Sequence, residues 1–266
     1  MTTGSQPVRL GWFSTGRGDG SYGLLQAALA AIDSGRLNAT LEFVFCNRER
    51  GQAPGSDRFM ALVESRGVPL VCLSSKKFRA ERDNKPWAQL REEYDRAAID
   101  LLDSYPADIS VNAGYMLIAP ILCQAHRMIN LHPALPDGPA GIWQNVTWDL
   151  IAQDAVETGA MVHSVTEEVD GGPVLSYCRF RIRGRDFDPL WADVAGHDIA
   201  ELKMDPGDEL PLFKAIRQAG VIRERPLLVA TLCALADRRI DLDKTAGRPP
   251  LDLTVEVESV VTRSGS

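Results

Sequence analysis

The chain has 266 residues, of which 45% are hydrophobic and 24% are charged, so it is long enough for one large α/β domain or two small ones. A formal net charge of −7 argues against a large nucleic acid partner, because neutralising phosphates requires a basic face. The five scattered cysteines form no CxxC pair, which indicates neither a disulfide framework nor a thiolate metal site. Residues 1–7 lack the basic and apolar regions of a signal peptide, and no apolar run reaches the roughly 18 residues that span a bilayer, so a cytoplasmic location is expected.

The first half of the chain alternates strand-like and helix-like segments. Val8–Ser14 is a continuous apolar run, as expected for a strand buried on both faces. Further strands are predicted at Leu41–Cys46, Pro69–Leu73 and Asp108–Ala113. Apolar residues at helical spacing predict helices at Leu24–Ser34, Asp57–Arg66 and Trp87–Ser104. This alternation predicts an α/β fold with a Rossmann-like, mostly parallel twisted sheet and helices on both faces.

The second half is less regular. Ile129–Leu131 reads as a short strand, and Met161–Val165 and Val174–Arg181 read as two strands around a Gly-Gly-Pro turn. Leu210–Asp237 is predicted to be mostly helical. From Asp241 onward, two prolines and a Ser/Gly end predict an extended tail.

A glycine-rich loop, Gly16-Arg17-Gly18-Asp19-Gly20-Ser21-Tyr22-Gly23, follows the first predicted strand. Glycines let a backbone approach an anion closely, and a helix N-terminus supplies N–H groups, so a phosphate site at Gly16, Gly18, Gly20 and Ser21 is favoured. The residues from Gly18 to Gly23 spell GxGxxG, but a dinucleotide site should also show an acid after the second strand. That strand ends in Cys46-Asn47-Arg48, so the acid is missing and a dinucleotide is disfavoured, although Arg48 would suit a 2′-phosphate. A plain glycine turn is the third alternative.

Asn130-Leu131-His132-Pro133 follows an apolar stretch. Side chains alternate along an extended segment, so Asn130 and His132 point the same way and Leu131 points into the core. The Asn130 amide and the His132 imidazole would then point at the same place, an arrangement suited to catalysis. The alternative is a histidine satisfied by a backbone partner at the end of a strand.

Three acids precede a glycine turn in the segment from His163 to Pro173. Such a turn can project Asp170 into a cleft, although an acidic, solvated hairpin tip is the commoner outcome. Spacing alone does not connect Asp170 with His132. The four histidines, at positions 126, 132, 163 and 197, lack metal-ligand spacing, so no metal site is predicted.

Together these segments resemble the folate-dependent formyltransferase family, most closely its glycinamide ribonucleotide formyltransferase branch. The resemblance covers roughly Val8 to Arg181, and more loosely the helix after Leu210. The motifs that carry it are Ser14 to Gln26, Ser110 to Met116, Asn130 to Pro136, and Val162 to Pro173.

The resemblance implies one formyltransferase domain over residues 1–266. Residues 1–125 would form a Rossmann-like half with the phosphate loop, 126–240 a catalytic and folate-binding half, and 241–266 the tail. The implied catalytic residues are Asn130, His132 and Asp170. The implied folate-binding residues are Arg91, Met116, Leu117, Ile118, Glu167 and Val169.

The implied co-substrate is 10-formyltetrahydrofolate, with no metal. The implied partner is a small phosphorylated amine, with no nucleic acid and no membrane. The resemblance leaves open whether the chain forms a homodimer. Formylation of glycinamide ribonucleotide in purine biosynthesis is the leading function. The alternatives are formylation of another amine, such as an amino sugar or a specialised metabolite, and a non-catalytic relative that binds folate or phosphate.

Several departures from the family affect the amine site more than the catalytic residues. The phosphate loop is longer than usual, and the segment from Met116 to Pro120 is one residue shorter. The segment 187–211 is an insertion. The position of the family's ribose-binding glutamate carries Val221, with Glu224 three residues further on.

Overall fold

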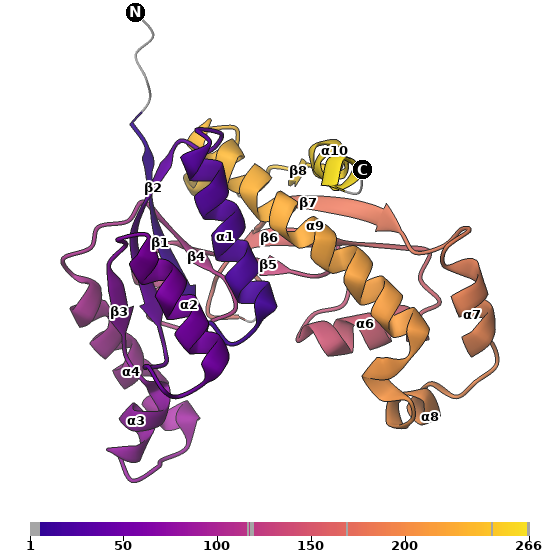
Figure 1. Ribbon diagram of the computed structural model, residues 1–266, viewed down its shortest axis with the longest axis horizontal. Helices are drawn as coiled ribbons and strands as arrows, with labels where there is room; N and C mark the ends of the chain where they lie inside the picture. The colour runs from indigo at the N-terminus through magenta and orange to yellow at the C-terminus, as the bar shows by residue number, and fades with distance from the viewer. Residues whose placement is uncertain (1–5, 116, 118–119, 169, 246, 265–266) are drawn as a thin grey trace, which may run out of the picture. The chain divides into compact units, whose positions relative to one another are not determined.

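The computed structural model of the protein describes residues 6–115, 117, 120–168, 170–245 and 247–264 (Figure 1). Eight strands occur in the order β3-β2-β1-β4-β5-β6-β7-β8. The elements divide into two compact units, and the division passes through β5, through α9 and before the last residue of β6. The first unit comprises Met1–Asn130, Ser164–Gly172 and Leu232–Asp241, and the second comprises Leu131–His163, Pro173–Thr231 and Leu242–Ser266.

The strands of the first unit are parallel neighbours wherever they pair, as the alternation of strands and helices predicts. They are β1 (Val8–Ser14), β2 (Ala39–Cys46), β3 (Leu70–Cys72), β4 (Ile109–Asn112) and β5 (Met128–His132). The connecting helices are α1 (Asp19–Asp33), α2 (Pro54–Ser65), α3 (Ser75–Ala80), α4 (Trp87–Leu102) and α5 (Leu122–Ala125). The predicted α/β class with a mostly parallel sheet is confirmed.

Aromatic residues of β1 and β2 build the core on one face of these strands. Phe13, Phe43 and Phe45 are fully buried, and the ring centroids of Phe13 and Phe43 lie 5.5 Å apart at 90°. The buried face of α4, with Leu90, Tyr94, Ala98 and Leu102, packs into the same cluster. Leu101, an apolar residue of the same helix, is 46% exposed. Residues 90, 94, 98 and 102 repeat every four positions, so residue 101 falls at the edge of the face.

The second unit combines a strand pair with the remaining helices. β6 (Glu157–Ser164) and β7 (Val174–Arg181) are antiparallel, and β8 (Leu251–Asp252) is parallel to β7. A Cβ at Gly159 would lie 2.1 Å from the Cys178 carbonyl oxygen, so this position requires glycine. The helices are α6 (Trp143–Ala152), α7 (Asp188–Val194), α8 (Ile199–Met204), α9 (Pro211–Ala236) and α10 (Thr254–Ser264), with 3-10 turns η1 (Gly207–Glu209) and η2 (Leu242–Lys244).

The insertion at residues 187–211 contains α7, α8 and η1. A cavity of about 450 Å³ lies beside it, bordered by α6, α7 and the segment that follows α7. The Arg183 guanidinium stacks on the Trp191 ring at 3.7 Å and pairs with Asp154 at 2.5 Å. Its charge is therefore already neutralised within this unit.

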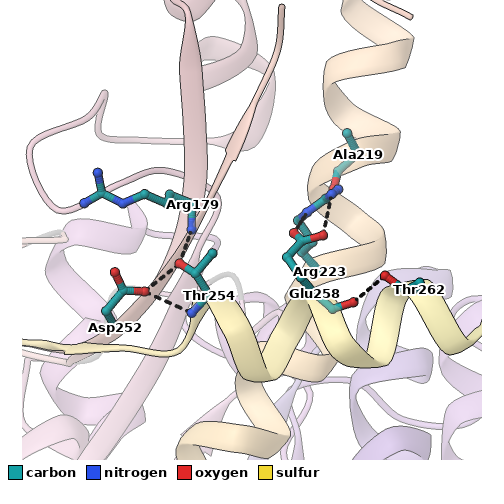
Figure 2. A network of polar contacts seen from close by, with 7 residues as sticks. All are labelled: Arg179, Ala219, Arg223, Asp252, Thr254, Glu258 and Thr262. Carbon is teal, nitrogen blue, oxygen red and sulfur yellow. Dashed lines mark hydrogen bonds and ion pairs between the residues drawn. The ribbon is translucent and has the colours of Figure 1, made fainter. Parts of the chain in front are cut away.

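The expected extended tail is corrected by α10, a helix of 11 residues (Figure 2). Asp252 Oδ1 accepts hydrogen bonds from the Thr254 N–H at 2.9 Å and from the Thr254 hydroxyl, which caps the helix. Glu258 then pairs with Arg223 of α9 at 2.5 Å. Leu253 and Val257 are fully buried, so apolar burial and the cap both stabilise the helix. None of the described helices is long and apolar enough to cross a membrane.

Candidate active site

The segment after β1 is held by hydrogen bonds to the segment after β4. The Ser14 hydroxyl donates to the Ala113 carbonyl at 2.7 Å, and the Thr15 N–H donates to the Gly114 carbonyl at 3.1 Å. The Gly16 N–H in turn donates to the Ser14 hydroxyl at 3.0 Å. Gly16 has a φ of +62° and its Cα packs on Phe59 of α2, so both backbone and space favour glycine here.

The helix that follows begins inside the predicted loop. α1 starts at Asp19, five residues before the expected start, so Gly20 and Ser21 lie in its first turn. The cause is Gly18, which is extended at the N-cap position and lets the chain enter the helix early. The Ser21 hydroxyl donates to the Gly18 carbonyl at 3.0 Å. No atom lies within 4 Å of a Cβ built at Gly18 or Gly20, so a ligand can approach the backbone there.

The strand β5 carries both candidate donors. Asn130 is half-buried, and His132, two residues further on, is only 2% exposed. His132 Nε2 lies 2.8 Å from the Pro139 carbonyl oxygen. A carbonyl can only accept, so Nε2 carries a proton in this contact. The backbone contact that the alternative interpretation expected is therefore present, and it fixes the ring orientation.

Asp170 lies in a loop of the first unit that is attached to β5. The Val165 N–H donates to the Met128 carbonyl at 2.8 Å, which holds the start of the loop beside the strand that carries Asn130. Asp170 has a φ of +55°, a conformation that aspartate adopts more readily than most residues. A Cβ at Gly172 would lie 1.7 Å from the Ser164 carbonyl oxygen, so the two ends of the loop approach too closely for any other residue.

The candidate folate residues are only partly described. Arg91 is half-buried on α4, Leu117 is half-buried, and Glu167 accepts a hydrogen bond from the Gln124 side chain. Met116, Ile118 and Val169 lie outside the described residues.

Asp95, one turn after Arg91, was not singled out from the sequence. Its side chain is 1% exposed, and Oδ2 accepts hydrogen bonds from the Ile121 and Leu122 N–H groups, each at 3.0 Å. Burial raises the pKa of Asp95, and the two N–H groups partly offset this rise. Asp95 thus anchors the start of α5, directly after the segment in which the folate residues are expected. An acid inside the apolar repeat of a helix was the sequence signal for this role.

In the second unit, Glu224 is 7% exposed and pairs with Arg217, seven residues earlier on α9. The Arg217 guanidinium stacks on the Trp143 ring at 5.0 Å. Val221 stands between these two charged residues in the sequence. The charge of the buried Glu224 is therefore already balanced by Arg217 within the same helix.

No group of three or more His, Cys, Asp or Glu side chains that could hold a metal ion occurs among the described residues.

Comparison with known proteins places these features in a family. Residues 18–186 match the sequence pattern of the family described as formyl transferase. Phosphoribosylglycinamide formyltransferase of Escherichia coli (strain K12) is 31% identical over 161 residues, which span 59% of this chain and 66% of that protein. Formyltetrahydrofolate deformylase of Bacillus subtilis (strain 168) is 28% identical over 156 residues, which span 58% of this chain and 45% of that protein.

A solved structure supports the fold. The crystal structure of glycinamide ribonucleotide transformylase 1 from Symbiobacterium toebii has a TM-score of 0.64 at 19% identity, and the match covers 90% of this chain and 92% of that one. The family pattern covers the loop after β1 from Gly18 onward, the strand β5 and the loop that carries Asp170. We therefore conclude that the chain belongs to the formyl transferase family.

Proposed function

We propose that this chain transfers a formyl group from 10-formyltetrahydrofolate to a primary amine. The proposal rests on the placement of Asn130 and the buried His132 two residues apart on β5. The chain that carries this strand belongs to the formyl transferase family. Glycinamide ribonucleotide, in purine biosynthesis, is the leading acceptor. It is named in the E. coli relative, and the open first turn of α1 is suited to its phosphate.

In the proposed mechanism the neutral amine attacks the formyl carbon and an oxyanion develops on the formyl oxygen. The Asn130 amide and the imidazolium of His132 donate to that oxygen. Because Nε2 of His132 faces the Pro139 carbonyl, the donor is Nδ1–H. Preorganised donors of this kind lower a barrier by roughly 3–4 kcal/mol each.

The remaining steps move protons. Asp170 accepts the proton that the attacking nitrogen loses, directly or through water. The tetrahedral intermediate then collapses, the bond from carbon to N10 of the folate breaks, and N10 takes up the proton that Asp170 had accepted, directly or through water. The products are the N-formyl amine and tetrahydrofolate, and no oxidant or reductant takes part.

The test compares kcat/KM for glycinamide ribonucleotide with that for its dephosphorylated riboside. A phosphate held at the first turn of α1 should improve kcat/KM by at least about thirtyfold, or roughly 2 kcal/mol. If both substrates are equally poor, the acceptor is another amine. The B. subtilis relative supplies a second assay, since release of formate without any amine would assign the catalytic residues to hydrolysis.

A further inference from the structure

The insertion at residues 187–211 borders a cavity of about 450 Å³ that the proposed reaction does not use. Of the described residues that line this cavity, none is a proposed catalytic residue, and all belong to the second unit. Most of them lie beyond residue 186, where the match to the family pattern ends. The volume is typical of small-molecule sites in proteins, which measure roughly 300–1,000 Å³.

The apolar part of the lining is preformed. Ile151, Trp191 and Val194 are 3%, 6% and 8% exposed, and all three belong to one buried cluster. The Trp191 indole N–H donates to the Ile182 carbonyl at 2.6 Å, which fixes the orientation of the ring. Side chains held in this way offer a ligand an apolar surface that does not have to be ordered on binding.

The charge of the Arg183 guanidinium, which also lines the cavity, is balanced. The group stacks on the Trp191 ring at 3.7 Å, and its Nη2 pairs with Asp154 Oδ1 at 2.5 Å. Its Nε donates to the Ala155 carbonyl at 3.3 Å. Arg183 and Asp154 together therefore add a fixed but neutral pair to the wall.

Two acceptors in the lining remain available. Asp188 Oδ1 accepts the Gly184 N–H at 2.8 Å, whereas Oδ2 accepts no hydrogen bond from the described residues. The His197 ring is exposed and likewise has no hydrogen bond to that part of the chain. A neutral imidazole keeps one nitrogen as an acceptor, so Asp188 and His197 can both receive N–H groups of a ligand.

The charge of the insertion favours a cation in this cavity. Residues 186–209 contain eight acidic side chains and one lysine. Because Arg183 and Asp154 cancel, the described lining keeps one net negative charge, that of Asp188. A field of this sign raises the local concentration of cations, and the buried Trp191 adds an apolar contact surface. A cation with an apolar body matches both features.

We propose that this cavity binds a small organic ammonium ion. The apolar body packs against Ile151, Trp191 and Val194, and the ammonium donates to the carboxylate of Asp188, with His197 as a second acceptor. The site goes beyond the proposed function, since it uses none of the residues assigned to formyl transfer. It gives the insertion a role in ligand binding.

The test compares three probes of similar shape and different charge. Phenethylammonium, phenethyl alcohol and phenylacetate are titrated separately into the full chain at low ionic strength, and binding is followed by ligand NMR. The ammonium should bind at least about tenfold more tightly than the alcohol, because a charge-assisted hydrogen bond is lost in the alcohol. Phenylacetate should bind more weakly than either, and added salt should weaken the binding of the ammonium.

Variants locate the binding. Asp188→Asn keeps an acceptor for the Gly184 N–H and should weaken binding of the ammonium about tenfold. Asp193→Asn is the matched control, because Asp193 lies on the same helix, removes the same charge and does not line the cavity. Ala192→Trp fills the cavity from an exposed position and should abolish binding.

Three results would each overturn the inference. They are a wild type that binds the ammonium no better than the alcohol, equal binding by Asp188→Asn and Asp193→Asn, and undiminished binding by Ala192→Trp. The measurements need neither folate nor acceptor, so a failure of the proposed formyl transfer would leave this result unaffected.

Discussion

At the scale of single residues, His132 constrains the proposed chemistry most. The ring is buried and one nitrogen already faces the Pro139 carbonyl, so only a defined ring orientation is compatible with donation to a reacting oxygen. Pro139 belongs to the segment Asp137-Gly138-Pro139-Ala140-Gly141, which follows β5 in the sequence. Substitutions in this segment should thus act on the proposed role of His132 through its tautomer and ring orientation.

We predict that His132 and Asp170 act as one unit. His132→Ala and Asp170→Asn should each lower kcat by orders of magnitude, because the proton acceptor and the oxyanion donor serve the same transition state. The double variant should lose little more than the worse single variant. Steady-state kinetics on the three variants measure the coupling, and fully additive losses would show that the two residues act independently.

Two adjacent glycines should respond differently to the same change. A Cβ at Gly172 would meet the Ser164 carbonyl oxygen at 1.7 Å, and backbone at this position cannot give way without opening the loop. The three atoms nearest to a Cβ at Gly171 belong to the Glu168 side chain, the closest at 2.7 Å, and that side chain can rotate. Gly172→Ala should therefore lower both Tm and kcat, with a loss of about 1–3 kcal/mol in stability, while Gly171→Ala stays close to the wild type. Comparable Tm values for the two variants would contradict this.

At the scale of elements, the buried Asp95 of α4 makes the stability of the fold depend on pH. The folded state raises the pKa of Asp95, so the protonated form is favoured on folding. Its contribution to stability is fully present below the unfolded pKa and is lost as the pH rises through the folded pKa. At neutral pH the charged Asp95 side chain therefore destabilises the folded state.

This gives a prediction with an internal control. Asp95→Asn keeps an acceptor oxygen for the Ile121 and Leu122 N–H groups and carries no charge. It should be more stable than the wild type at pH 7, and the advantage should shrink as the pH falls toward 4. Asp95→Ala leaves two N–H groups unpaired and should lose at least about 2 kcal/mol. Denaturant unfolding at several pH values measures both, and a wild type more stable than Asp95→Asn at pH 7 would contradict the sign.

The helix α10 should depend on its cap. Asp252→Ala removes the acceptor for Thr254 and should cost about 1 kcal/mol, seen as faster hydrogen exchange in residues 254–262. Val255→Ala is the control, because Val255 is 80% exposed in the same helix. Exchange that is unchanged in Asp252→Ala would mean that the Arg223–Glu258 pair and the burial of Val257 hold the helix without the cap.

The sequence predicts some of these elements better than others, for physical reasons. Both bounds of β1 and β7 are correct, because each strand has an apolar pattern that ends in polar or charged residues. α10 was missed because its 11 residues have only a few buried positions, and because its ion pair joins Glu258 to Arg223, which is distant in sequence. The start of α1 was missed because Gly18, Gly20 and Gly23 resemble a loop until the N-cap geometry is known. The assignment of one catalytic set depended on the family resemblance, since spacing alone does not connect the motif of Asn130 and His132 with that of Asp170.

At the scale of the whole molecule, the proposed chemistry relies on side-chain donors. Activity should therefore survive prolonged dialysis against a chelator. A 10-formyl folate analogue that cannot transfer its group should raise Tm by mass action under the same conditions. Loss of activity that zinc restores would contradict this reading, and an unchanged Tm would argue against folate as the co-substrate.

The first unit is discontinuous in sequence, and this affects its synthesis. Residues 1–130 are completed only by Ser164–Gly172, whose Val165 bonds to Met128, and by Leu232–Asp241, whose Cys233 thiol donates to the Arg36 carbonyl at 3.5 Å. A nascent chain leaving the ribosome therefore exposes unpaired strand and helix surface until residue 241 has emerged. Truncations after β5 should therefore aggregate instead of folding.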